Sequence, residues 1–176
     1  MKAEQLIIVD EFDQELGIGE KLKTHQEGKL HRAFSIFVFD DFNRLLIQKR
    51  ASEKYHSGGL WSNTCCGHPR PGEQILTAAH RRLQEEMNFD CPLRKFFDFT
   101  YRAELGNNLI ENEFDHVFIG KFNGSPRPDP NEAEDWKWID FDELKLNVRD
   151  QPQEYTYWLG MALEKSEWES LNDLTD

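Results

Sequence analysis

Hydrophobic residues occur along this chain in short runs separated by polar turns, and most of the runs have the length of a β-strand. Residues 4–9 form the first run and predict a short strand. Residues 35–39 and 45–48 are two further runs, and the polar segment 40–43 between them is typical of a hairpin turn. Residues 136–139 predict another short strand.

Two longer runs predict a second pair of strands. They cover residues 96–103 and 111–122, and Gly106, Asn107 and Asn108 supply turn residues between them. Strands and helices mix in this chain without a βαβ rhythm, so we expect an α+β fold with a mixed β-sheet packed between helices.

Residues 73–87 have the periodicity of a helix. One face carries apolar residues: Ile75, Leu76, Ala79, Leu83 and Met87. Arg82 and Glu86 fall within about 20° of Ile75, which places both where the helix meets the body of the protein. Asn88 is expected to end the helix.

Residues 153–168 predict a final helix, and its apolar stripe consists of Tyr155, Trp158, Leu159, Ala162 and Leu163. A short helix is expected to start at residues 142–144. Glycine, proline, serine and asparagine make residues 51–72 a predicted long loop, and three prolines make 124–135 a predicted surface loop.

Length and composition indicate one globular domain spanning residues 1–176, since a domain has about 150 residues. With 33 acidic and 21 basic residues the formal charge is −12, which disfavours binding to nucleic acid or an anionic membrane but allows a local basic pocket. No apolar run approaches the roughly 20 residues of a membrane span. The run at residues 6–9 is too short for a signal peptide, and three cysteines without a CxxC motif fit a reducing cytoplasm.

The segment from Gly67 into the predicted helix resembles the Nudix box, Gly-x5-Glu-x7-Arg-Glu-U-x-Glu-Glu-x-Gly-U, in which U is a bulky apolar residue. The box, at about residues 67–89, is matched at Gly67, Glu73, Arg81, Leu83, Glu85, Glu86 and Phe89. Such a loop and helix can hold Mg²⁺ against a diphosphate, although an ordinary amphipathic helix with solvated acids is the alternative. Asn88 stands where the box has glycine. Arg82 stands where it has glutamate, and a cation there favours holding a phosphate.

Three further clusters could carry chemistry. They are Cys65–Pro69 preceded by Trp61–Thr64, the Glu-Asn-Glu segment at 111–113, and His25 with His31. The two glutamates alternate along a predicted strand, so they point to one face and can share a metal ion. Taken singly, each cluster has an ordinary explanation as a hydrogen-bonded histidine, a solvated acid pair or a packed cysteine.

Together these motifs resemble type I isopentenyl-diphosphate isomerases in order and spacing. The resemblance extends from about Lys21 to Trp158 and includes His25, His31–Phe34, Trp61–Asn63, Cys66–Pro69, Tyr101, Arg102 and Glu111–Glu113. It implies a Nudix-like fold and a role in isoprenoid biosynthesis. The implied reaction interconverts isopentenyl and dimethylallyl diphosphate through a 1,3 proton shift and a carbocation-like intermediate, with an acid and a base on opposite faces of the substrate.

The resemblance also implies roles for individual residues. The catalytic positions are Cys66, Glu113 and Tyr101, the last as the hydrogen-bond partner of the glutamate; which of the first two is the acid in the forward direction stays open. Cys65 is expected to be a packing residue. Trp158 matches the aromatic residue that stabilises positive charge, and Trp61 is a second candidate, although either could be a core residue.

Two metal sites are implied. Mn²⁺ or Zn²⁺ would be held by His25, His31, His68, Glu111 and Glu113, a mixed set of imidazole and carboxylate ligands that suits such ions. Mg²⁺ would lie between the substrate diphosphate, Glu86 and the backbone carbonyl of Cys66. The diphosphate contacts would be Lys21, Arg50, Lys54 and Arg82.

Two other classes of function are alternatives. A Nudix hydrolase acting on a nucleoside diphosphate derivative needs no role for Cys66, and Arg82 and residues 111–113 argue against it. A noncatalytic binding module would bind its ligand without forming a product. The favoured interpretation is a monomeric cytoplasmic enzyme whose partner is a small-molecule diphosphate.

Overall fold

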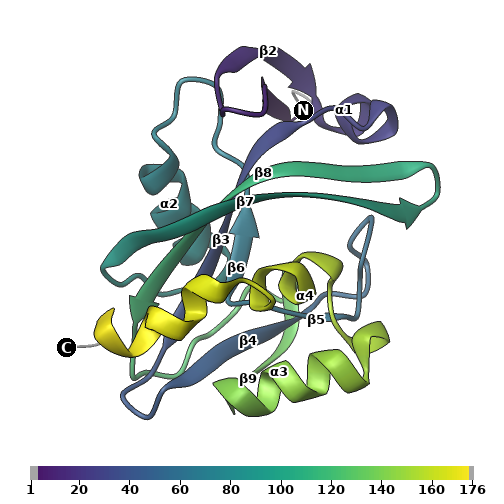
Figure 1. The fold of residues 1–176 in the computed structure, drawn as a ribbon. Coiled ribbons are helices and arrows are strands. Elements are labelled where there is room, and N and C mark those ends of the chain that lie inside the picture. The colour runs from purple at the N-terminus through teal and green to yellow at the C-terminus, as the bar shows by residue number, and fades with distance from the viewer. Residues whose placement is uncertain (1–3, 175–176) are drawn as a thin grey trace.

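Within residues 4–174, which the computed structural model describes (side chains to Leu171), the hydrophobic runs fold into nine strands of one mixed sheet (Figure 1). The strands are β1 Gln5–Val9, β2 Glu15–Glu20, β3 His31–Phe39, β4 Arg44–Arg50, β5 Trp61–Ser62, β6 Cys65–Gly67, β7 Leu93–Gly106, β8 Leu109–Lys121 and β9 Ala133–Asp140. The helices are α1 Lys21–Glu27, α2 Ile75–Met87, α3 Phe141–Asp150 and α4 Tyr157–Leu163, with 3₁₀ turns η1 Pro152–Glu154 and η2 Ser166–Leu174.

β3 lies at the centre of the sheet. It runs parallel to β8 along its whole length, and β7 continues the sheet as the antiparallel partner of β8. On its other side β3 meets β1, β6 and β4 in succession, while β2 and β9 extend the sheet beyond β1 and β4. This arrangement is the mixed sheet that the sequence predicts.

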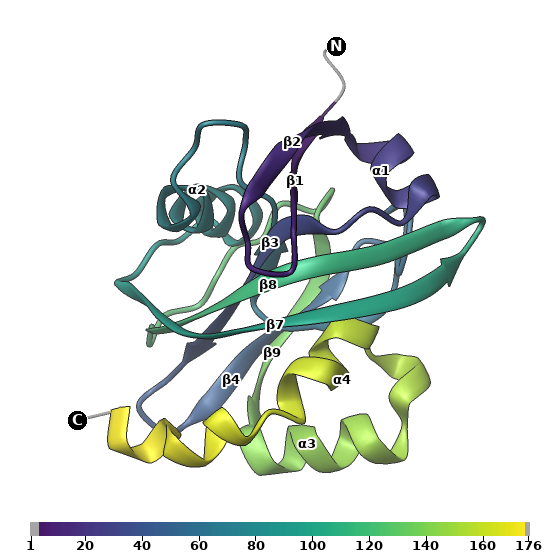
Figure 2. The ribbon, with the colours of Figure 1, turned by 45° about the horizontal axis from the view of Figure 1, so that its top comes forward.

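Helices cover both faces of β3 (Figure 2), and its side chains are therefore buried on both sides. Phe34, Ile36 and Val38 share a core with the apolar face of α2. Phe37 and Phe39 share the other core with α3, α4 and η2, in which Trp168 is buried. The predicted sandwich of a mixed sheet between helices is therefore confirmed.

Several predicted elements are confirmed. The strand at 4–9 is β1, the helix at 73–87 is α2, and Asn88 ends α2 in the left-handed conformation at φ 57°. Asn107 and Asn108 are both left-handed in the tight turn between β7 and β8. The strand at 136–139 and the helix that starts near 142 are β9 and α3, both longer than predicted.

Other predictions were wrong in extent. The loop at 51–72 contains β5 and β6, because residues 65–67 pair with β3. The loop at 124–135 ends three residues early, because β9 begins at Ala133. The two strands of the predicted hairpin, β3 and β4, pair only next to the turn, where Phe39 lies opposite Leu45. Beyond it, β3 pairs with β8 and β4 pairs with β9.

The predicted helix at 153–168 is shorter, because α4 covers only Tyr157–Leu163. Tyr155 is extended and forms a bridge to Trp61, and the backbone N–H of Thr156 donates to the Trp61 carbonyl. These bonds to β5 replace the helical bonds. The sequence also gave no prediction for β2 or α1. No helix among the described residues has the length and apolar character needed to span a membrane.

Candidate active site

The register of the sheet brings the predicted site residues together. Glu113 on β8 lies directly beside His31 on β3 and directly beside Tyr101 on β7. On the other side of β3, Ser35 lies beside Cys66 on β6. Because paired residues point to the same face and the face repeats every second residue, all these side chains face one side of the sheet.

A sharp turn at the end of α1 brings His25 to the same place. Gly28 ends this helix at φ 62°, a conformation that glycine adopts without strain, and a Cβ there would lie 3.2 Å from Ile110. The turn reverses the chain into β3, so that the rings of His25 and His31 lie 5.0 Å apart. Asn112 fixes the turn by donating to the Gly28 carbonyl at 3.0 Å.

Four side chains form a group that could hold a metal ion. The ligand atoms of His25, His31, His68 and Glu111 all lie within 4.8 Å of one another. The Nδ1 atoms of His25 and His31 donate to the backbone carbonyls of Lys21 and Lys29 at 2.8 and 2.9 Å. Their Nε2 atoms therefore carry no proton and each presents a lone pair. Both atoms are buried without a hydrogen bond, so a cation fits this set of ligand atoms.

The contact between His25 and Glu111 supports the same conclusion. His25 Nε2 and Glu111 Oε1 are 2.8 Å apart, and both are acceptors when Glu111 is ionised. Burial and the neighbouring charge of Glu113 raise the pKa of Glu111. Burial acts to raise the pKa of Glu113 as well, but contacts with the imidazoles of His31 and His68 hold the pKa of Glu113 well below its usual range. A shared cation would offset the repulsion between the two carboxylates.

Glu113 has two further well-placed contacts. Its Oε2 accepts a hydrogen bond from the Tyr101 hydroxyl at 2.6 Å, and its Oε1 lies 2.9 Å from His68 Nε2. Burial and the adjacent carboxylate raise the pKa of Tyr101, which keeps its hydroxyl a donor. The carboxylate is thus fixed at both oxygens.

Cys66 is held as a neutral thiol. Its S–H donates to Asn63 Oδ1 at 3.1 Å, and Ser35 Oγ lies 3.7 Å away. Burial raises the pKa of the thiol to about 12. Cys65 is completely buried in the core under α2, as expected for a packing residue.

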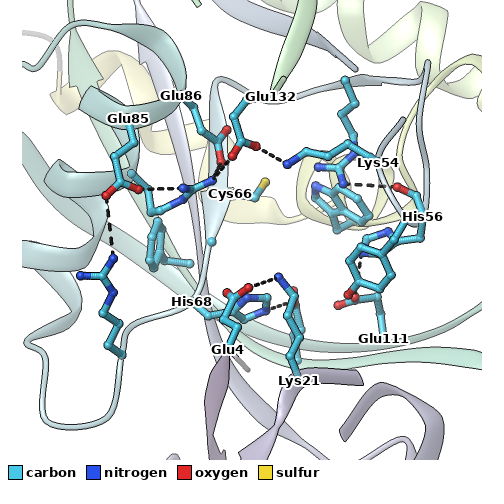
Figure 3. Close-up of a pocket in the computed structure, with 18 of the residues that line it drawn as sticks. Glu4, Lys21, Lys54, His56, Cys66, His68, Glu85, Glu86, Glu111 and Glu132 are labelled. Carbon is cyan, nitrogen blue, oxygen red and sulfur yellow. Dashed lines mark hydrogen bonds and ion pairs between the residues drawn. The ribbon is translucent and has the colours of Figure 1, made fainter. Parts of the chain in front are cut away.

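Three of the predicted cations line the same space, each beside an acid. Lys21 pairs with Glu4 at 2.8 Å, and Lys54 pairs with Glu132. Arg82 contacts Glu86 at 2.5 Å and Glu132 at 3.1 Å. Glu132 holds Lys54 and Arg82 close together, whereas Lys21 lies across the cavity from Lys54, beside Glu4 and His68 (Figure 3). All three cations line the cavity, where an anionic ligand can reach them.

The remaining residues of the box helix have a structural role. Glu73 accepts two hydrogen bonds from Arg81, at 2.8 and 2.9 Å, and a third from the backbone N–H of Arg70. This paired contact ties the loop before α2 to the helix. Glu86, in contrast, is buried and accepts from Gln48 at 3.0 Å, so it faces the body of the protein as the helical wheel predicts.

These groups surround a cavity of about 700 Å³. Predicted site residues that line it are Lys21, Arg50, Lys54, Cys66, His68, Arg82, Glu86, Tyr101, Glu111, Glu113 and Trp158. His25 and His31 lie behind the wall as members of the metal-binding group. The structure does not bring Trp61 to the cavity: its ring contacts Lys137 instead, 4.4 Å from the ring centre.

Several lining residues were not predicted. Tyr55 and His56 lie in the segment read as a loop, and His56 packs edge-on against Trp158 and lies 3.4 Å from Glu111. Glu132 lies in the other predicted loop. Of these three residues only His56 offered a signal in the sequence, as a potential metal ligand. Glu132 gave none, because its partners Lys54 and Arg82 are distant along the chain.

Known proteins share both the fold and much of the sequence. The family model of the NUDIX domain matches residues 29–159. Isopentenyl-diphosphate Delta-isomerase 2 of Aromatoleum aromaticum is 56% identical over 162 residues, which cover 92% of this chain and 86% of that protein. Isopentenyl-diphosphate Delta-isomerase of Burkholderia multivorans is 53% identical over 163 residues, or 93% of each chain. The solved structure of DR0079 from Deinococcus radiodurans has a TM-score of 0.76 at 19% identity and covers 91% of this chain and 97% of that one, so it shares the fold.

Proposed function

Because this chain belongs to the isopentenyl-diphosphate Delta-isomerase family within the Nudix superfamily, we propose that it interconverts isopentenyl and dimethylallyl diphosphate by moving one proton onto the five-carbon chain and removing another. The observation that carries the proposal is the shared cavity. A thiol and a carboxylate line it together, the carboxylate accepts a hydrogen bond from a phenol, and the four predicted cations line the same cavity.

Cys66 and Glu113 are the two groups that exchange protons with the substrate. Addition of a proton to the terminal carbon of the alkene and loss of one from C2 shift the double bond by one position. Placed acid and base groups each typically accelerate such a step 10²–10⁴-fold. Tyr101 acts on Glu113, because its hydroxyl donates to one carboxylate oxygen and leaves the other beside His68.

The diphosphate binds to the cations that line the cavity. Lys21, Arg50, Lys54 and Arg82 form charge-assisted contacts with its oxygens, which are stronger than neutral hydrogen bonds. Arg50 also lies over the Trp158 ring, 5.2 Å from its centre, so the ring borders both the charged and the apolar part of the substrate.

Trp158 stabilises the carbocation-like centre. An aromatic face attracts positive charge by roughly 2 kcal/mol or more where water is excluded, and it is not a nucleophile. Its ring is buried in the wall of the cavity, against His56. Exclusion of water matters because water would capture the cation as an alcohol.

We propose two metal ions, of which the first fits the buried histidine group described above. His25, His31, His68, Glu111 and Glu113 would hold Mn²⁺ or Zn²⁺, and Glu86 with the backbone carbonyl of Cys66 would hold Mg²⁺ against the diphosphate. The bound ions supply positive charge that keeps the carboxylates ionised and neutralises the diphosphate. We further propose that the enzyme acts as a monomer in the cytoplasm.

The first experiment follows the substrate by NMR in the presence of Mg²⁺ and Mn²⁺. We expect dimethylallyl diphosphate as the product, and loss of turnover in Cys66→Ala and Glu113→Gln with an unchanged circular dichroism spectrum. Cys65→Ala is the matched control and should keep its turnover. Release of phosphate would indicate a hydrolase, binding without product would indicate a binding module, and full activity in either catalytic variant would refute the role of that residue.

A further inference from the structure

Asn63 occupies a turn between β5 and β6, beside the cavity but not in its wall. Its side chain is fully buried (0% exposed) and makes four hydrogen bonds. Nδ2 donates to the backbone carbonyls of Ile36 and Cys65 at 3.1 and 2.9 Å. Because both partners are acceptors, the amide cannot be turned over, and its oxygen must face the other way.

The carboxamide oxygen accepts from two directions. On one side the Cys66 S–H donates to it at 3.1 Å. On the other side the Ser62 hydroxyl donates to it, also at 3.1 Å. The single oxygen atom of Asn63 is therefore a common anchor for two side chains.

Ser62 extends this chain of hydrogen bonds to the aromatic wall. Its Oγ accepts from the indole Nε1–H of Trp158 at 3.0 Å, and an indole can only donate. Since the proton of Ser62 is used toward Asn63, Thr156, 3.1 Å away, is the donor in its own contact with Ser62. The direction of every bond from Trp158 through Ser62 and Asn63 to Cys66 is thus determined.

We propose that Asn63, acting with Ser62, is a positioning residue that holds the Cys66 thiol and the Trp158 indole at fixed places around the same cavity. The inference rests on the proposed function, in which the thiol exchanges a proton and the indole faces the cation. A proton donor and a cation-stabilising ring must keep their relative position during the reaction, and an error of about 1 Å can cost 10²-fold in rate. One buried amide sets the position of both.

The test uses Asn63→Ala in the full-length enzyme and two signals that do not depend on activity. The infrared S–H stretch of Cys66 is assigned by its absence from Cys66→Ala, and the indole N–H resonance of Trp158 by its absence from Trp158→Phe. We expect Asn63→Ala to move the S–H band to higher frequency, because the acceptor is lost, and to shift the indole resonance, although Asn63 does not touch Trp158. We expect kcat to fall roughly 10- to 100-fold with KM within about threefold, since the cations of the cavity are unchanged.

Ser62→Ala keeps the test decisive where Asn63→Ala does not fold. It should shift the indole resonance and lower kcat while leaving the S–H band in place. The matched control is Thr64→Val. Thr64 is equally buried in the same turn, and its hydroxyl bonds only to the backbone of Leu46 and Val38. This control should leave both signals and kcat unchanged.

The outcomes separate the inference from the proposed function. Shifted signals with a kcat within twofold of wild type would overturn the positioning role while the isomerase activity stands, and so would an unshifted S–H band in folded Asn63→Ala. Absence of isomerase activity in the wild-type enzyme would instead contradict the proposed function, and with it the reason for positioning, whatever the two signals show.

Discussion

Arg82 is the residue at which this chain departs most from the Nudix box, and its contacts give the difference a physical meaning. Its guanidinium contacts three carboxylates, those of Glu85, Glu86 and Glu132, which raise its pKa although burial acts to lower it. A glutamate at this position would add a fourth acid to the group and favour further metal binding. The arginine instead provides a guanidinium that can bind a phosphate of the substrate.

Replacement of Arg82 by glutamine should weaken substrate binding. We expect KM for isopentenyl diphosphate to rise roughly 10- to 100-fold, because a charged hydrogen bond contributes about 1.5–3 kcal/mol, while kcat changes by less than about threefold. Steady-state kinetics measure both. Lys23→Gln is the control of equal charge loss, since Lys23 is exposed and lies outside the cavity; an equal rise of KM in that variant would attribute the effect to net charge alone.

At the scale of elements, the sequence predicted those whose own residues carry a periodicity. The long helix α2 and the strand β7 have clear apolar faces, and the C-terminal half of β8 is an apolar run; all three elements were predicted, with ends within a few residues of those observed. β6 becomes a strand only by pairing with residues far away on β3, so its three residues carry no local signal. α1 has seven residues and an exposed Leu22, and such a short helix has too few apolar positions for a pattern.

More of the site than of the fold could be predicted from the sequence, because most site residues belong to family motifs. Family motifs fix the type and order of residues such as Cys66 and Glu113, and the cavity contains both. Glu132 carries no motif, and its importance follows only from its contacts with Lys54 and Arg82. Trp61 lies inside a motif, but its strand directs the ring toward Lys137.

The turn at the end of α1 permits a test of how an element positions the metal-binding group. Gly28→Ala should lower the free energy of unfolding by about 1–2 kcal/mol, the cost of a left-handed alanine, and should also weaken Mn²⁺ or Zn²⁺ binding because His25 moves. Urea unfolding and calorimetric titration measure the two effects. In Gly106→Ala, where φ is 82° and no atom lies within 4 Å of the new Cβ, only stability should fall; equal loss of metal affinity in both variants would contradict the account.

At the scale of the whole molecule, a row of buried acids lowers the stability of the folded state, in a protein that already carries a charge of −12. Glu111, Glu113 and Asp115 follow one another on the same face of β8 and are all buried. Burial and the neighbouring Glu113 charge raise the pKa of Asp115, which favours its neutral form. A bound cation would stabilise the folded state by offsetting this repulsion.

Metal removal should therefore lower the melting temperature. We expect a chelator to reduce Tm and added Mn²⁺ or Zn²⁺ to restore it, since a ligand at 100 times its Kd stabilises by about 2.7 kcal/mol. His31→Gln should lose this response, and His80→Gln, whose imidazole pairs with Asp90 at the surface, should keep it. Calorimetry that shows the same metal response in both variants would place the ion elsewhere.

The most direct test of the central claim is the fate of hydrogen at carbon. Isopentenyl diphosphate is incubated in D₂O with the enzyme, Mg²⁺ and Mn²⁺, and the products are followed by ²H and ³¹P NMR. The account predicts dimethylallyl diphosphate with deuterium bound to carbon and an intact diphosphate. Free phosphate from a substrate whose carbon chain carries no deuterium would contradict it.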